Sequence, residues 1–174
     1  MAQRTQRKLE FQALLDYALH RLGARAYSAG ELRQKLERRA ESAEDVPGVL
    51  ARLKEYGYLD DRRYAESLAS SQLANHGVGK VRVLHDLRKR RVAPKVAEQA
   101  VAEAYKDTDE VGLIEAFLRR KYKNVKLDEF LSETRNLASA YRRLRMAGFT
   151  SANSVRVLKR FAREAEQLEG LEEQ

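Results

Sequence analysis

Helical spacing of apolar residues runs through almost the whole chain, whereas the strict alternation typical of a strand never lasts. Val81-Arg82-Val83 and Val155-Arg156-Val157 alternate for one step and then return to helical spacing. Apolar residues three or four positions apart form stripes that begin at Phe11, Val46, Val96 and Phe130. The sequence therefore predicts an all-α protein in which these stripes form the core.

Residue types that begin and end helices mark the boundaries. Ser28-Ala29-Gly30-Glu31 has the pattern of a capping box, in which Ser28 accepts a backbone N–H and Glu31 reaches back. Asp60 stands at a predicted N-cap, and Asp61 falls in the first turn, where the helix dipole favours a carboxylate. Four glycines follow amphipathic runs and are predicted to end helices: Gly23, Gly57, Gly77 and Gly148. We therefore interpret Asp60-Asp61 as part of a turn between helices and not as a metal or acid–base pair.

One spacing occurs three times along the chain. The copies are Leu32-x3-Leu36-x3-Ala40, Val83-x3-Leu87-x3-Arg91 and Ala140-x3-Leu144-x3-Gly148. Each copy lies in the middle helix of a predicted helix–helix–helix unit, and the units cover residues 8–57, 58–107 and 108–170. Such units bury little apolar surface alone and stabilise one another by stacking. The expected architecture is three tandem three-helix repeats in an elongated, curved molecule.

Composition excludes several kinds of protein. The 174 residues include no cysteine, which excludes disulfides and thiolate metal sites and fits a reducing compartment. No apolar run approaches the roughly 20 residues of a membrane-spanning helix. The first residues also lack the apolar stretch of a signal peptide. We expect a soluble, cytoplasmic, monomeric protein.

The charge balance favours an acidic partner. There are 34 Lys and Arg residues against 26 Asp and Glu, a formal net charge of +8, and each predicted unit has an excess of positive charge. Positive charge spread in this way suits a long basic face that binds nucleic acid, a nucleoprotein or an acidic protein. The alternative is a solvated helical surface that happens to be basic.

Cations cluster where predicted helices end, and these clusters are the candidate contact residues. The helix dipole accounts for part of the clustering, but four consecutive cations at residues 88–91 repel one another more than a cap requires. Arg also forms bidentate pairs with carboxylate and phosphate. Gly77 and Gly79 either open a helix N-terminus to such an anion or form a plain turn. The predicted contact residues are Lys80, Arg82, Arg88, Lys89, Arg91, Lys95, Arg119, Arg120, Lys121, Arg142 and Arg143.

Signatures of catalysis are weak. The three histidines, His20, His76 and His85, do not stand in the spacings of a zinc site. His85-x-x-Arg88 matches a fragment of the tyrosine-recombinase pattern, but one such match is expected by chance in so basic a chain. Val81 stands where a phosphate-binding loop would have Ser or Thr. The sequence therefore predicts no catalytic residue, metal ion or cofactor.

Four stretches of the chain carry a resemblance to a known family. They read YSAGELRQKLERR, LKEYGYLDDRRYAESL, HGVGKVRVLHDLRKRRV and LRMAGFTSANSVRVL. In this order they resemble the RecX family, the bacterial regulators of the RecA recombinase, from about Ala13 to Phe161. The most specific part is the stretch 57–61 with Tyr64-Ala65, followed by the helix that ends in Arg90-Arg91-Val92.

The resemblance implies a non-enzymatic modulator built from three tandem three-helix repeats. Proteins of this family bind the RecA–DNA filament, lie along its groove, and restrain filament growth, strand exchange and co-protease activity. The implied partners are therefore the RecA filament and, weakly and without sequence preference, nucleic acid, in DNA repair, recombination and the SOS response.

The chain departs from the family pattern at three turns. Ala40 and Arg91 stand where the family repeats usually have glycine, and Met146-Ala147 stands where paired basic residues are common. These departures affect the transfer of interface residues from the family to this chain.

Two alternatives stay open on the residues alone. A helical regulator that acts directly on duplex DNA is favoured by the basic helix 81–91, although a recognition helix usually offers base-reading side chains at its N-terminal end. An enzyme, either a nuclease or a recombinase, would depend on Asp60, Asp61 or the pair His85 and Arg88.

Overall fold

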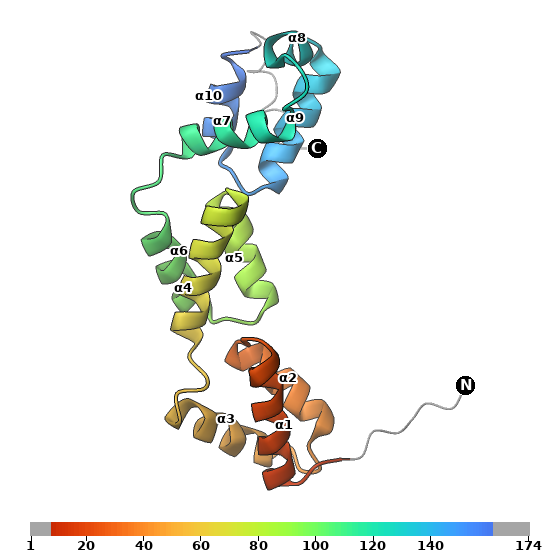
Figure 1. The fold of residues 1–174 in the computed structure, drawn as a ribbon, viewed down its shortest axis with the longest axis vertical. Coiled ribbons are helices and arrows are strands. Elements are labelled where there is room, and N and C mark those ends of the chain that lie inside the picture. The colour runs from red at the N-terminus through yellow and green to blue at the C-terminus, as the bar shows by residue number, and fades with distance from the viewer. Residues whose placement is uncertain (1–7, 162–174) are drawn as a thin grey trace, which may run out of the picture. The chain divides into compact units, whose positions relative to one another are not determined.

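The computed structural model describes residues 8–161 and confirms the predicted all-α class (Figure 1). Its helices are α1 (Phe11–Ala24), α2 (Ala29–Arg39), α3 (Asp45–Glu55), α4 (Asp61–Ser71), the π-helical turn η1 (Gln72–His76), α5 (Lys80–Lys89), α6 (Pro94–Ala104), α7 (Glu110–Lys121), α8 (Leu127–Leu131), α9 (Thr134–Met146) and α10 (Ser151–Leu158). Over the same residues, strand-like pairing is limited to one isolated bridge between Leu9 and Ala40. No helix within this range is long and apolar enough to cross a bilayer.

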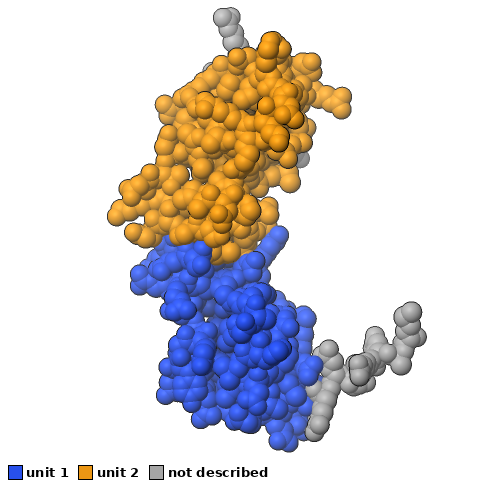
Figure 2. All heavy atoms as spheres, viewed as in Figure 1, with its two compact units in different colours: residues 1–67, 87–100 blue, residues 68–86, 101–174 orange. Residues whose placement is uncertain are grey.

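The described residues form two compact units, coloured separately in Figure 2. Unit 1 holds residues 8–67 and 87–100, and unit 2 holds residues 68–86 and 101–161. All three boundaries run through helices of the predicted second repeat, since α4, α5 and α6 each contribute residues to both units. The division into three repeats at residues 57 and 107 stays a prediction, as does the elongated shape. Residues 162–170 of the predicted third repeat lie outside the described residues.

The core of unit 1 is built by α1, α2 and α3. Their apolar stripes bury Leu14, Leu32, Leu36, Val49 and Leu53 completely. Full burial of one such side chain contributes about 1.5–3 kcal/mol relative to leaving it exposed, so these stripes hold the three helices together.

The core of unit 2 lies among α7, α8, α9 and α10. Ile114, Leu118, Leu137, Leu144 and Phe149 are fully or almost fully buried there. Helix α8 is an additional short helix between the first and middle helices of the predicted third set, and it adds the buried Leu131 to this core.

The predicted helix ends are confirmed at three of the four glycines. Gly57, Gly77 and Gly148 follow helix ends and have left-handed backbones, with φ of 73°, 53° and 88°. The prediction at Gly23 was wrong, because α1 continues through this glycine and ends at Ala24. A Cβ at Gly23 would meet no atom within 4 Å, so nothing there requires glycine.

The predicted capping box at Ser28 forms only in part. The Ser28 hydroxyl accepts the Glu31 N–H at 3.0 Å and caps α2 as expected. The Glu31 carboxylate instead binds the Arg25 guanidinium at 2.9 Å. Glu31 also raises the pKa of Arg25, chiefly through this hydrogen bond.

Candidate partner-binding surfaces

Asp60 and Asp61 are both used to hold helix N-termini. The Asp60 carboxylate accepts the Arg63 N–H at 3.0 Å, which confirms its predicted place as the N-cap of α4. The Asp61 carboxylate accepts the Ala29 N–H at 2.6 Å and so reaches the start of α2. Within residues 8–161 no three His, Asp or Glu side chains gather as a metal ion would require. The predicted places of Asp60 and Asp61 at the start of α4 are therefore confirmed, while the contact of Asp61 with Ala29 had no local signal in the sequence.

In unit 1 the C-terminal end of α5 meets the N-terminal end of α2. The Ser28 hydroxyl donates a hydrogen bond to the Arg90 carbonyl while it caps α2. A Cβ on Gly30 would overlap the Arg91 backbone, so the close approach requires glycine. We call this arrangement, in which the end of one helix meets the start of another, a head-to-tail helix joint.

Arg91 takes the conformation that usually belongs to glycine at this joint. Its φ is 58°, its N–H donates to the Arg88 carbonyl at 2.9 Å, and the Val92 N–H donates to the Leu87 carbonyl at 3.1 Å. This pair of bonds is a Schellman motif, in which the left-handed residue is normally glycine. The basic cluster at residues 88–91 therefore includes a residue held in a strained backbone conformation.

Unit 2 contains a second head-to-tail helix joint, between the C-terminal end of α9 and the N-terminal end of α5. The Gly79 N–H donates to the Ala147 carbonyl at 2.8 Å, and the Val81 N–H donates to the Gly148 carbonyl at 3.2 Å. A Cβ on Gly79 would overlap the Gly148 carbonyl. Because protein carbonyls occupy these N–H groups, residues 77–79 form an inter-helix turn, the alternative to an anion site considered above.

Every predicted contact cation is exposed to solvent, whereas the neighbouring Arg90 is not. Arg90 is half-buried, donates to the Tyr64 hydroxyl at 2.9 Å and lies 3.9 Å from the Glu31 carboxylate. Burial raises the pKa of Tyr64, and the positive charge of Arg90 partly offsets this. Arg90 therefore has a structural role in unit 1, which separates it from Arg88, Lys89 and Arg91.

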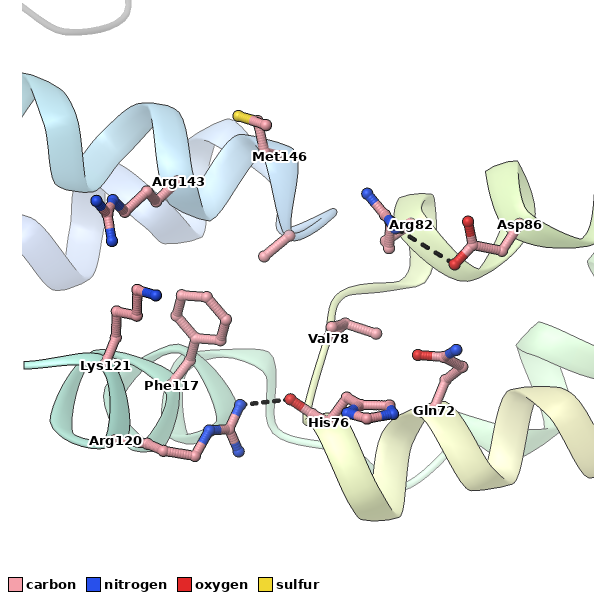
Figure 3. Close-up of a pocket in the computed structure, with 11 residues that line it drawn as sticks. Gln72, His76, Val78, Arg82, Asp86, Phe117, Arg120, Lys121, Arg143 and Met146 are labelled. Atoms are coloured by element: carbon pink, nitrogen blue, oxygen red, sulfur yellow. Dashed lines mark hydrogen bonds and ion pairs between the residues drawn. The ribbon is translucent and has the colours of Figure 1, made fainter. Parts of the chain in front are cut away.

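A cleft of about 810 Å³ in unit 2 gathers four of the predicted cations (Figure 3). Arg82 comes from α5, Arg120 and Lys121 from the end of α7, and Arg143 from α9. Lys80 lines a separate small pocket of about 120 Å³, and Arg119 and Arg142 are exposed but line neither cavity. The cleft is thus where predicted contact residues distant in the sequence come together.

The cations of the cleft differ in the groups that they contact. The Arg82 Nε lies 3.3 Å from the Asp86 carboxylate, the one acidic side chain in the cleft lining, and the Arg120 guanidinium donates to the His76 carbonyl. The Arg143 guanidinium lies 5.9 Å from the centre of the Tyr122 ring. The cleft therefore carries a clear excess of positive charge.

The cleft also has uncharged lining residues that were not among the predicted contact residues. Phe117, Met146 and Val78 give it apolar surface, while Gln72 and His76 come from the π-helical turn η1. Gly77 ends that turn with its left-handed backbone. The one available signal was Met146, which occupies a position where the resembled family often has a basic residue.

A carboxylate anchors the start of α10 in the same unit. Glu110 accepts the Thr150 N–H at 3.0 Å, the Thr150 hydroxyl at 2.6 Å, and the Asn153 amide. Burial alone would raise the pKa of Glu110, but these hydrogen bonds and the charge of Lys80 together lower it. Glu110 is therefore ionised in the folded protein for structural reasons.

Two family models match the chain in consecutive segments. Residues 15–53 match the first three-helix domain of RecX, and residues 60–101 match its second three-helix domain. The regulatory protein RecX of Trichlorobacter lovleyi is 34% identical over 105 residues, which cover 60% of this chain and 68% of that protein. That of Vibrio vulnificus is 32% identical over 135 residues, covering 78% and 84%. The chain belongs to the RecX family.

Two further RecX comparisons bear on length and fold. The regulatory protein RecX of Deinococcus radiodurans is 36% identical over 114 residues, which are 66% of this chain but only 54% of that longer protein. The crystal structure of RecX from Lactobacillus salivarius aligns with a TM-score of 0.67 at 17% identity, over 87% of this chain and 96% of that one. This last likeness shows the fold, and the sequence relatives show the family.

The departures from the RecX pattern have different structural outcomes. Ala40 has an extended backbone and pairs with Leu9, so α2 ends without a left-handed residue. Arg91, at the corresponding turn after α5, keeps the left-handed conformation. Met146 leaves a side chain that is 73% exposed at the cleft, where this RecX-family chain has apolar surface in place of charge.

Proposed function

We propose that this protein is a non-enzymatic cytoplasmic regulator that binds RecA, or the nucleoprotein filament that RecA forms, and mainly inhibits its recombinase and co-protease activities. The observation that carries the proposal is its membership of the RecX family, whose members are named regulatory proteins. The predicted contact residues support it, because cations that remain exposed are available for the carboxylates and phosphates of a nucleoprotein.

The non-enzymatic part of the proposal is supported by the use of the acidic pair. Both Asp60 and Asp61 accept backbone N–H groups at helix starts, which leaves them poorly placed to hold a metal ion for a nuclease. Metal-dependent nicking of DNA by the purified protein that disappears in the Asp60→Ala variant would contradict the proposal.

The direct experiment is a pull-down of the protein with RecA, with and without single-stranded DNA and a nucleotide, combined with a strand-exchange assay. We expect retention with the filament and slower strand exchange. Retention on duplex DNA alone, at one preferred sequence in a footprinting assay, would favour the alternative of a duplex-binding regulator. Weak binding to DNA that falls steeply with added salt is expected in either case, because phosphate contacts release counterions.

A further inference from the structure

We propose that the cleft of unit 2 binds an acidic peptide segment that carries an apolar side chain. The proposal deepens the proposed function, on which it rests, by naming the kind of segment that the cleft takes from the protein partner. It is carried by the combination, in one cleft, of cations without an acidic partner, exposed apolar surface and a Phe117 ring that Arg120 already covers.

The uncompensated cations gather at one end of the cleft. Figure 3 shows Lys121 and Arg143 at the end away from Arg82 and Asp86, which neutralise each other. Neither Lys121 nor Arg143 has an acidic partner among residues 8–161. The Arg120 guanidinium donates a hydrogen bond to the uncharged His76 carbonyl. A carboxylate entering this end would meet positive charge from three side chains, and an Arg fork pairs with it through two hydrogen bonds.

Apolar surface lies beside these cations. Met146 on α9 is 73% exposed and lines the rim of the cleft, and Phe117 and Val78 line it as well. Methionine is a flexible, polarisable side chain that suits the binding of varied apolar partners, and interfaces are enriched in Met, Phe and Arg. This surface fits a Leu-like or Met-like side chain next to the carboxylate.

The aromatic rings favour a peptide over a nucleic acid. Sequence-tolerant binding of single strands depends on open ring faces for base stacking. Phe117, the one aromatic ring in the cleft lining, forms a T-shaped pair with Phe149 with centroids 5.5 Å apart. The Arg120 guanidinium lies over the Phe117 ring, 5.6 Å from its centre.

The wall formed by η1 supplies groups for a peptide backbone. Gln72 and His76 both line the cleft from this π-helical turn. Turns of this kind occur frequently at functional sites, because the wider turn displaces side chains from their α-helical positions. The Gln72 amide offers both a donor and an acceptor, which matches the alternating groups of an extended peptide.

The experiment uses a methionine in the cleft as a spectroscopic probe. The chain contains two methionines, Met1 and Met146, so labelling with [methyl-13C]methionine gives one probe in the cleft. The probes are a synthetic peptide of alternating Glu and Leu, the same peptide with Gln for Glu, the same peptide with Gly for Leu, and an oligothymidylate. We expect saturable movement of the Met146 methyl resonance with the Glu–Leu peptide and much weaker responses to the two altered peptides.

A charge-reversal pair tests the cations. Lys121→Glu with Arg143→Glu is expected to weaken binding of the Glu–Leu peptide by at least about tenfold, since two charge-assisted contacts become repulsive. The matched control, Lys106→Glu with Arg156→Glu, makes the same change in net charge at exposed positions of unit 2 outside the cleft and is expected to bind as the wild type does. Lys121→Gln with Arg143→Gln serves as a milder variant should charge reversal impair folding, judged by circular dichroism.

Several outcomes would overturn the inference. Movement of the Met146 resonance with oligothymidylate but not with the peptide would show a nucleic-acid site, and no movement with any probe would show that the cleft is unused. A strand-exchange assay distinguishes failure of the cleft proposal from failure of the proposed function. Full regulation of RecA by the charge-reversed cleft variant overturns the cleft assignment and leaves the proposed function intact. A wild-type protein without effect on RecA overturns the proposed function and, with it, the assignment of the segment to that partner.

Discussion

Gly79 lies so close to Gly148 that a Cβ atom on Gly79 would overlap the Gly148 carbonyl group. The same relationship recurs between Gly30 and Arg91, where a Cβ on Gly30 would overlap the Arg91 backbone. In both head-to-tail helix joints the end of one helix offers carbonyls that the start of another helix binds. The joints thus satisfy groups that a helix end leaves without intrahelical partners.

The joint in unit 2 predicts that replacing glycine by alanine changes the free energy of unfolding in opposite directions at Gly79 and at Gly23. Gly79→Ala should destabilise the protein by about 1–3 kcal/mol, because the added methyl group forces α5 and the end of α9 apart. Gly23→Ala is the matched control, since its Cβ meets open space inside α1, and it should stabilise the protein by about 0.5–1 kcal/mol. Urea unfolding followed by circular dichroism measures both. Equal midpoints for the two variants would show that the close approach at Gly79 is relaxed in solution.

The left-handed backbone of Arg91 predicts a stabilising substitution. Arg91→Gly removes the steric cost of a positive φ and, after the added entropy of the unfolded chain, should raise the free energy of unfolding by about 0.5–1 kcal/mol. Arg88→Gly loses the same charge from the helical part of α5 and should instead lower that free energy by a similar amount, about 0.5–1 kcal/mol. A loss of stability in Arg91→Gly would mean that the Arg91 side chain contributes more than its backbone costs.

Glu110 predicts a pH dependence of stability. Its pKa is lowered on folding, so its contribution is complete above the unfolded value of 4.5 and is lost as pH falls through the lower folded value. The stability advantage of the wild type over Glu110→Gln should therefore shrink in the acidic range below pH 4.5. Denaturant unfolding of both proteins across a pH series measures it. A constant difference across the series would show that Glu110 keeps the same proton affinity in both states.

Tyr105 predicts a pH dependence of stability opposite to that of Glu110, because its contribution is lost as pH rises. Burial raises the pKa of its hydroxyl from 10.0 to about 12, and the hydroxyl donates to the Val78 carbonyl at 2.8 Å. Because the folded value exceeds the unfolded one, this contribution is complete below pH 10.0 and is lost as pH rises towards 12. Tyr105→Phe should cost about 1 kcal/mol at neutral pH through the lost hydrogen bond. Tyr56→Phe, at an exposed tyrosine, should have no such effect.

The basic cluster of unit 1 is predicted to serve the partner and not the fold. Val83 and Leu87 take the buried side of α5, while Arg88 and Lys89 are exposed. Arg88→Glu with Lys89→Glu should lower stability by no more than about 1 kcal/mol, through the helix dipole, while it removes regulation of RecA in a strand-exchange assay. Arg33→Glu with Arg38→Glu makes the same charge change on exposed positions of α2 and should keep regulation. Full regulation by the first variant would assign the interface to other cations.

Local patterns were sufficient for much of the fold. The caps at Ser28 and Asp60 and the left-handed glycines at Gly57 and Gly148 were all predicted, because each depends on bonds between residues three to five positions apart. Gly23 misled the prediction, since a glycine within a helix has the same appearance in a sequence as one that follows it. The exposed cations were also predicted as contact residues, but the sequence did not indicate which of them lie close together in the folded protein.

The amino-acid sequence by itself determined the helical class, the family and the exposed positive charge, since periodicity, capping and composition act within a few residues. Only the tertiary structure decided that Asp61 holds Ala29, that Ser28 binds the Arg90 carbonyl, and that Arg143 shares a cleft with Lys121 and Met146. The bonds of Asp61 and Ser28 join residues 32 and 62 positions apart. No local propensity reports such contacts, because they arise from the packing of whole helices and from backbones that approach where a Cβ is absent.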